Sequence, residues 1–139
     1  WVTRAVVCGS GSLSAVVTVS SGAGPKNVVA TQTDTAGNGG TDNRDFILDS
    51  VAPAITITAP AAGTVAQAGV TLVGTCSAGL TVNISGAGVS APSTTTCPAG
   101  QFSTPITFSS GDGTKNAIAS QTDLGGNTAS EKSFEQKRI

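Results

Sequence analysis

The sequence predicts an all-β chain, and its composition and its residue patterns both support this. The 139 residues are rich in Ala, Val, Thr, Ser and Gly, with 18 glycines and 6 prolines. Small β-branched residues favour strands, and Gly, Asn, Asp and Ser favour the turns between strands. Short stretches with an alternating or apolar pattern recur along the chain, and helical periodicity is absent. We therefore expect short strands joined by tight turns.

A long internal repeat sets the size of the folding unit. Residues 8–38, CGSGSLSAVVTVSSGAGPKNVVATQTDTAGN, align without a gap with residues 97–127, CPAGQFSTPITFSSGDGTKNAIASQTDLGGN. The offset is constant at 89 residues (97 − 8 = 89), and 16 of the 31 aligned positions are identical. A period of about 90 residues suits an immunoglobulin-type β-sandwich, which has roughly 100 residues. We therefore predict immunoglobulin-like β-sandwich repeats.

The repeat divides the chain into a partial module followed by a complete one. Residues 50–139 hold a complete copy, whereas residues 1–49 hold only the C-terminal half of a module. Without its N-terminal strands, this half cannot close a standard sandwich alone. Two explanations are open: the polypeptide extends upstream, or another chain supplies the strands.

The complete module predicts seven strands, A to G, in order along the chain. They are AITITAP (54–60), VTLVGTC (70–76), LTVNISG (80–86), VSAPSTTT (89–96), QFSTPITF (101–108), KNAIASQT (115–122) and ASEKSFEQKRI (129–139). Each is short, has an alternating or apolar pattern, and is bounded by turn residues. Glycine-containing connections such as 61–63 and 110–113 provide the backbone freedom that tight turns require.

Composition and charge argue against several classes of function. The net charge is −1 and the Lys and Arg residues are mostly scattered, so no nucleic-acid partner is expected. No run of about 18 apolar residues occurs, so no membrane insertion is expected. The absence of histidine removes the usual Ser–His and Cys–His nucleophile pairs. The chain is therefore not predicted to be an enzyme.

Two motifs resemble a known family. The stretches QTDLGGNTAS (121–130) and LDSVAPAITITAPAAGTV (48–65) are similar to the bacterial immunoglobulin-like tandem repeats of large surface adhesins. The resemblance covers nearly the whole chain. It implies a structural stalk or spacer that is extracellular, on the bacterial cell surface. Its partners would be neighbouring modules, and the sequence does not identify the distal ligand of the full protein.

The alternative function is that of a subunit in a self-assembling extracellular filament. In that case strands of a neighbouring chain would complete the half-module 1–49. The two functions differ in the expected state of Cys8, which would be a free thiol in the stalk and an intermolecular disulfide in the filament.

The family resemblance also implies calcium at the module junctions. In a seven-strand sandwich the F–G loop, here 123–127, lies at the end where strand A enters. Asp123 and Asn127 should therefore approach Asp49 in the linker, and carboxylate, amide and backbone oxygens are the ligands that Ca²⁺ prefers. By the repeat, Asp34 and Asn38 would serve a module upstream. The alternative is that these Asp and Asn residues only shape turns.

The second copy departs from this pattern in its last strand. There DFILDS (45–50) is matched by SFEQKR (133–138), so that Phe46 pairs with Phe134 after one deletion. Asp49 then falls opposite Lys137. No acidic linker is predicted at that end, and a calcium junction there is not expected.

The predicted sandwich also indicates where the three cysteines lie and which of them can pair. Strands B and E are antiparallel neighbours in an immunoglobulin-like sheet, so Cys76 at the end of B lies near Cys97 at the start of E. We predict a disulfide between them, which fits an oxidising extracellular setting; two buried thiols are the alternative. Cys8 occupies the position of Cys97, and its partner would lie upstream or in another chain.

Overall fold

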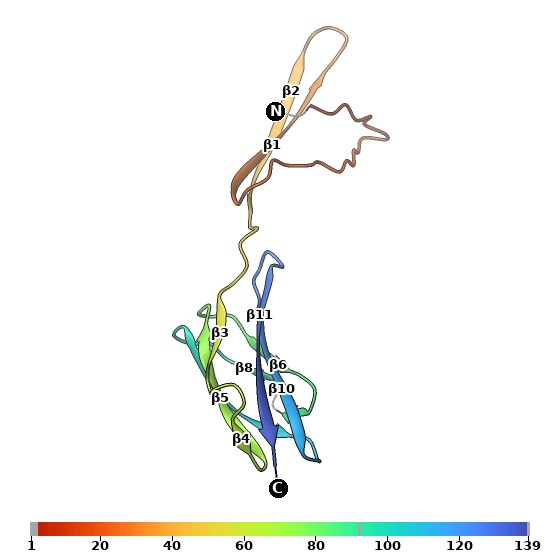
Figure 1. Cartoon of the computed structure of the whole chain (residues 1–139). Coiled ribbons are helices and arrows are strands. Elements are labelled where there is room, and N and C mark those ends of the chain that lie inside the picture. Colours follow the sequence, from red (N-terminus) through yellow and green to blue (C-terminus); the bar gives the residue numbers. More distant parts are fainter. Residues whose placement is uncertain (1–2, 92, 139) are drawn as a thin grey trace. The chain divides into compact units, whose positions relative to one another are not determined.

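The computed structural model describes residues 3–91 and 93–138, and it is all-β, as predicted (Figure 1). No helix occurs among these residues, and hence none is long and apolar enough to cross a membrane. The chain divides into two compact units, Trp1–Leu48 and Asp49–Ile139, which are called unit 1 and unit 2.

Unit 2 is built from two sheets. One sheet has the strand order β3-β5-β9-β7, with the bounds Ile55–Ala59, Gly69–Cys76, Gln101–Phe108 and Val89–Ala91. The other has the order β4-β11-β10-β6-β8, with the bounds Val65–Ala66, Thr128–Lys137, Gly113–Thr122, Val82–Ser85 and Thr94–Thr95. The β4–β11 pair is parallel, and the other pairs are antiparallel.

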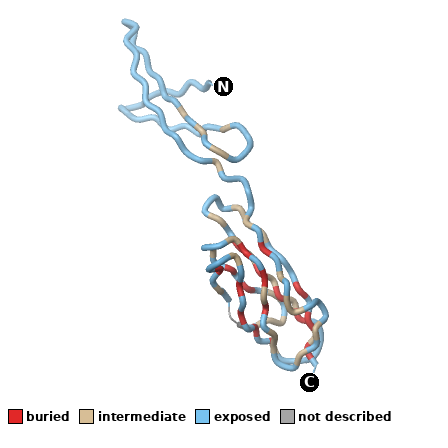
Figure 2. The backbone as a smooth tube through the Cα atoms, turned by 90° about the vertical axis from the view of Figure 1, so that its left-hand side faces the viewer, coloured by how far each residue is buried: buried red, intermediate tan, exposed pale blue. Residues whose placement is uncertain are grey.

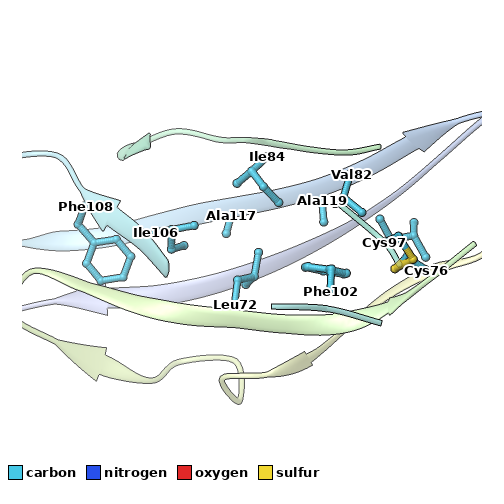
Figure 3. Packing of buried hydrophobic residues seen from close by; sticks show 11 residues of the cluster. Leu72, Cys76, Val82, Ile84, Cys97, Phe102, Ile106, Phe108, Ala117 and Ala119 are labelled. Atoms are coloured by element: carbon cyan, nitrogen blue, oxygen red, sulfur yellow. A yellow bond between two sulfur atoms is a disulfide. The ribbon is translucent and has the colours of Figure 1, made fainter. Parts of the chain in front are cut away.

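The hydrophobic core of unit 2 lies between these sheets in a sandwich-like arrangement. Strand β9 alternates strictly between exposed and buried residues, as expected for a strand with one face on the core. Figure 3 shows Ala117 and Ala119 of β10 on the opposite side of the core from Leu72 of β5. The buried apolar residues are Ile55, Leu72, Cys76, Val82, Ile84, Cys97, Phe102, Ile106, Phe108, Ala117 and Ala119.

The strands differ from the predicted ones in two places. Predicted strand D, 89–96, is divided between β7 in one sheet and β8 in the other, and β4 was not predicted. These pieces are only two or three residues long and lie at sheet edges. So short a strand is defined by the neighbour it pairs with and not by a residue pattern of its own.

The described part of unit 1, residues 3–48, contains a single hairpin. Strand β1 (Gly24–Thr33) pairs antiparallel with β2 (Gly39–Leu48) along its whole length. Residues 3–23 contain no strand, only an isolated bridge between Gly9 and Ser12. None of the residues described in unit 1 is buried, and all the buried residues belong to unit 2 (Figure 2). Residues 3–48 therefore form no core.

The hairpins of the two units are the same element in two copies. Strands β1 and β2 correspond to β10 and β11 with the offset of 89 residues at every strand end (113 − 24 = 89). The cross-strand pairs coincide as well, since Gly24 faces Leu48 just as Gly113 faces Lys137.

The predicted deletion before Phe134 is therefore wrong. Glu135 is the equivalent of Phe46, and Lys137 is the equivalent of Leu48 (137 − 48 = 89). Turns 34–38 and 123–127 have the same length, and turn length fixes the register of a hairpin from its closed end. The likeness of two phenylalanines cannot override that constraint.

Candidate functional site at the hairpin turns

The motif Asp-x-x-Gly-Asn forms the turn of each hairpin. In unit 2, the N–H of Asp123 donates to the Asn127 carbonyl at 3.0 Å, and the N–H of Gly126 donates to the Asp123 carbonyl at 3.1 Å. The equivalent bonds in unit 1 measure 2.9 and 3.1 Å. Gly126 has a φ of 86°, and Gly37 in unit 1 has a φ of 90°. Glycine adopts this left-handed conformation at little cost, which explains its presence in both copies.

The aspartate and the asparagine of the motif bind each other. Oδ1 of Asp123 accepts the backbone N–H of Asn127 at 2.9 Å, and the Asn127 amide nitrogen donates to both carboxylate oxygens at 3.0 and 3.2 Å. In unit 1, Asp34 accepts the backbone N–H groups of Asn38 and Ala36 at 2.8 and 2.9 Å, and the Asn38 amide at 2.8 Å. These are Asx-type turns, so turn formation alone accounts for the recurrence of the pair.

Hydrogen bonds stabilise the ionised form of both aspartates. The side chain and backbone of Asn38 hold the pKa of Asp34 below its ordinary value of 3.8. Burial raises the pKa of Asp123, but hydrogen bonds from the Asn127 side chain and backbone outweigh it and leave that pKa below 3.8 as well. Both carboxylates are therefore charged acceptors at neutral pH.

Asp49 lies beside the unit 2 turn, as predicted. The Asn127 amide nitrogen donates to the Asp49 backbone carbonyl at 3.1 Å across 78 residues of sequence. The Asp49 carboxylate is occupied locally, since it accepts the N–H of Val51 at 3.1 Å. Gly125 leaves room for this contact, because a Cβ there would lie 2.9 Å from both Asp49 Cβ and the Asn127 amide nitrogen. The approach thus uses the backbone of Asp49 and not its carboxylate.

Calcium at these turns stays a prediction. Among residues 3–91 and 93–138, no three Asp, Glu, His or Cys side chains form a group that could hold a metal. At the unit 2 turn, the Asn127 amide nitrogen contacts the oxygens of Asp123 and Asp49 that a cation would use. Because Ca²⁺ needs six to eight oxygens, the ion would have to displace this nitrogen and recruit further ligands.

A second polar contact, made by Gln121, was missed in the sequence. Its side chain is fully buried, and its Oε1 accepts the N–H of Ser77 at 2.8 Å. Its Nε2 donates to the carbonyls of Ser77 and Leu80 at 3.1 and 3.2 Å. Gln121 thereby fixes the turn after β5 to strand β10. The identity of Gln32 and Gln121 in the two copies was the signal available for this role.

The inward face of β11 carries a row of polar residues that was also missed. Ser133, Glu135 and Lys137 are buried and alternate with less buried residues. Oε1 of Glu135 accepts the Ser133 hydroxyl at 2.6 Å, but Oε2 has no hydrogen-bond partner in the part of the chain that the structure describes. The row was missed because Phe46 was paired with Phe134, which assigned the wrong residues to the inward face of the strand.

Lys137, a member of this row, and Lys115 on β10 bind the β9–β10 turn. Lys115 faces Glu135 across the strands, but its ammonium group donates to the Ser109 hydroxyl and the Ser110 carbonyl at 3.3 and 3.4 Å. Lys137 donates to the Ser109 carbonyl at 2.9 Å. The charges of these lysines therefore serve to hold a turn in place.

The predicted disulfide between Cys76 and Cys97 is present. The two residues are separated by 21 positions, their Cα atoms are 6.2 Å apart, and both side chains are buried. Figure 3 shows the bond at one end of the core and Phe108 at the other. Cys8 is a free, exposed cysteine. A disulfide is compatible with an extracellular location.

Comparison with protein-family models, with curated proteins and with solved structures finds no match for this chain. The resemblance to bacterial immunoglobulin-like repeats therefore stays a prediction from its motifs. The geometry shows a recurring hairpin with a fixed turn, a sandwich-like unit that contains a disulfide, and a unit 1 with no buried residue among those described. The hairpin turn and the disulfide hold backbone segments together, whereas the side chains of unit 1 are left exposed.

Proposed function

We propose that this chain is a stalk or spacer segment, built from immunoglobulin-like modules, of a secreted or surface-displayed repetitive bacterial protein. The observation that carries the proposal is the repeated hairpin, which has the same register and the same turn in both copies. Repeating a structural unit along a chain extends the molecule, and each copy contributes its own stability. The pairing of β5 with β9, and the disulfide that joins the last residue of β5 to Cys97 in the segment before β9, support the immunoglobulin-like assignment.

The proposed mechanism is resistance to extension. The disulfide prevents the chain between Cys76 and Cys97 from lengthening, and by chain-entropy arithmetic it contributes about 3 kcal/mol to the stability of unit 2. Asn127 holds Asp49, the residue that follows β2 in sequence, and Gln121 holds the turn after β5. These contacts would keep the module closed under tension.

Single-molecule pulling of the full chain, held at its two ends, tests this proposal. We expect unit 2 to open in one cooperative step. After reduction of the disulfide, the released length should grow by about 70 Å, because each of the 21 freed residues spans roughly 3.3–3.6 Å when extended. Unit 1 should extend without a force peak, since it has no core. Gradual extension of oxidised unit 2 at low force would argue against a mechanical role.

The rival function is that of a filament subunit, and the coreless unit 1 favours it. In this proposal a neighbouring chain completes unit 1 and bonds to Cys8. Light scattering of the purified chain over a range of concentrations separates the two functions. A filament subunit forms growing assemblies and intermolecular disulfides, whereas the purified stalk segment, with no further copy of the repeat bound to it, keeps a constant mass and a free Cys8 thiol.

Calcium is a second proposed role for the turn residues. Asp49, Asp123 and the amide oxygen of Asn127 would supply ligands once the Asn127 amide has rotated. Asp34 and Asn38 would do the same toward an upstream module. Thermal melting in Ca²⁺ and in EGTA tests this role. A rise in Tm that Asp49→Ala and Asp123→Ala abolish supports a site, and an unchanged Tm leaves turn formation as the full account.

A further inference from the structure

We propose that unit 1 takes up one extended strand from a further copy of the repeat, and that this strand is the equivalent of β5. It would pair with residues 12–18 and form a disulfide with Cys8. The inference rests on the proposed tandem-repeat stalk and identifies the partner of its incomplete unit. It is argued from what the same sequence does in unit 2, where the partner strand is present.

Residues 12–19 are the first-copy equivalent of β9. The sequences SLSAVVTV and QFSTPITF lie 89 residues apart, at the offset of the repeat, and both carry apolar residues at alternate positions (101 − 12 = 89). In unit 2, β9 pairs with β5 from Gln101 to Thr107. In unit 1, residues 13–19 form no strand. The missing neighbour explains this difference, because an extended segment needs partners for its backbone N–H and C=O groups.

The side chains that would pack against the partner strand are exposed. Leu13 and Val17 are 57% and 53% exposed, whereas their equivalents Phe102 and Ile106 are each 2% exposed in unit 2. A groove lined by residues 17–20 and 26–28 lies between this segment and β1. Apolar side chains arranged in this way are typical of a surface that binds another polypeptide.

Two polar features indicate what the partner contains. Gln32 is exposed, and its side chain makes no hydrogen bond within the described residues, whereas Gln121 binds the turn that follows β5. Cys8 is free, whereas Cys97 is bonded to Cys76, the last residue of β5. A strand that ends in cysteine and continues into such a turn would provide partners for both Gln32 and Cys8.

The register of unit 2 predicts the register of the complex. Gly69 faces Thr107 and Thr75 faces Gln101, so the partner strand would run antiparallel from Thr18 to Ser12. Its terminal cysteine would then reach Cys8, as Cys76 reaches Cys97. This is β-strand addition, in which backbone hydrogen bonds supply affinity and alternate side chains supply specificity.

A synthetic peptide with the sequence of residues 69–76, GVTLVGTC, tests the proposal on the full chain. The peptide carries its cysteine as a mixed disulfide with 2-thiopyridine. The Cys8 thiolate attacks the peptide sulfur, the new S–S bond forms, and thiopyridine leaves as the thiolate, so no further oxidant is needed. The other two cysteines are already bonded to each other and do not react.

The control peptide, CVTLVGTG, has the same composition with its cysteine at the wrong end. Binding before exchange raises the local concentration of the peptide disulfide at Cys8. We therefore expect a rate with GVTLVGTC that saturates with concentration and exceeds the control rate by at least tenfold. Hydrogen exchange should then show protection of residues 12–18 only in the chain bonded to GVTLVGTC. Equal rates for the two peptides would show that Cys8 is merely an accessible thiol.

Adjacent valines provide matched variants. Val17→Asp alters the equivalent of buried Ile106, and Val16→Asp alters the equivalent of exposed Pro105. We expect V17D to remove the rate advantage and V16D to keep it. An advantage that survives V17D overturns the proposal, as does a chain that associates with itself through unit 1 and excludes the peptide. The force response of unit 2 does not depend on these results, so the two proposals fail separately.

Discussion

The carboxylate of Asp123 holds its turn only while it is ionised, so acid should loosen unit 2. Hydrogen bonds keep its folded pKa below the ordinary 3.8. A depressed folded pKa contributes stability that is present above the unfolded value, about 3.9, and is lost as the pH falls through the folded value. We expect urea denaturation to show a loss of stability below about pH 4. Asp123→Asn should lower stability at pH 7 and flatten this dependence.

Asp34→Asn is the matched control for this prediction, because Asp34 makes the same turn in unit 1. It should leave the pH dependence of unit 2 unchanged. An acid response of unit 2 that is identical in wild type and in Asp123→Asn would show that other carboxylates govern it.

Glu135 presents the opposite case, a buried carboxylate with one oxygen that lacks a hydrogen bond among the described residues. The equivalent residue in unit 1 is the apolar Phe46, which is exposed there. Because an unsatisfied buried polar atom costs roughly 1–3 kcal/mol, we expect Glu135→Leu to raise the free energy of unfolding by about 1 kcal/mol or more. Chemical denaturation measures this change, with exposed Glu131→Leu as the control. A large loss of stability would instead indicate that Glu135 is paired in solution.

At the scale of elements, the two hairpin turns differ at the position before the motif glycine. Unit 1 has Ala36 there, and unit 2 has Gly125, which lies against Asp49 and Asn127. Gly125→Ala should push these groups apart, break the Asn127–Asp49 hydrogen bond, and lower the stability of unit 2 by about 1 kcal/mol. Thermal melting measures the change. Ala36→Gly, the control, should have no effect on the melting of unit 2. If Gly125→Ala is as stable as the wild type, the turn relaxes without cost and the prediction fails.

The positions of the main strands could be predicted from sequence, but the inward face of β11 and the short edge strands could not. The inward face of β9 can be predicted, because its exposed and buried residues alternate strictly. That of β11 cannot, because Phe134 points outward and Glu135 inward, and only the turn fixes that choice. Strand β4 has two residues and no pattern of its own.

For the candidate site, the approach of Asp49 to the turn could be predicted from sequence, but the atoms that make the contact could not. Topology brings Asp49 to the β10–β11 turn, and this approach follows from the order of strands in a sandwich. Which atom of Asp49 makes the contact depends on a local turn, in which its carboxylate binds the N–H of Val51. Gln121 could not be assigned in advance, because its partners are backbone groups whose positions depend on the folded chain.

At the scale of the whole molecule, one hairpin occurs in two contrasting environments. In unit 2 it forms part of a closed core, and in unit 1 it stands with its faces exposed. An isolated two-stranded hairpin is marginally stable in water. We expect amide hydrogen exchange to be fast throughout β1–β2 and slow throughout β10–β11, although the two share their sequence frame.

Reduction of the disulfide provides the matched comparison within the same chain. Opening the Cys76–Cys97 bond should lower the stability of unit 2 by about 3 kcal/mol and speed its slowest exchange, while unit 1 does not change. Equal protection of the two hairpins before reduction would show that unit 1 is already covered in solution.

The short strands at the sheet edges of unit 2 have a consequence for how such repeats avoid misassembly. Copies of similar sequence that are synthesised one after another can exchange strands before each has folded. Strands β4, β7 and β8 have only two or three residues, so these edges offer few free backbone N–H and C=O groups with which a strand of another copy could pair. Short edge strands of this kind therefore limit unintended pairing between neighbouring copies at these positions.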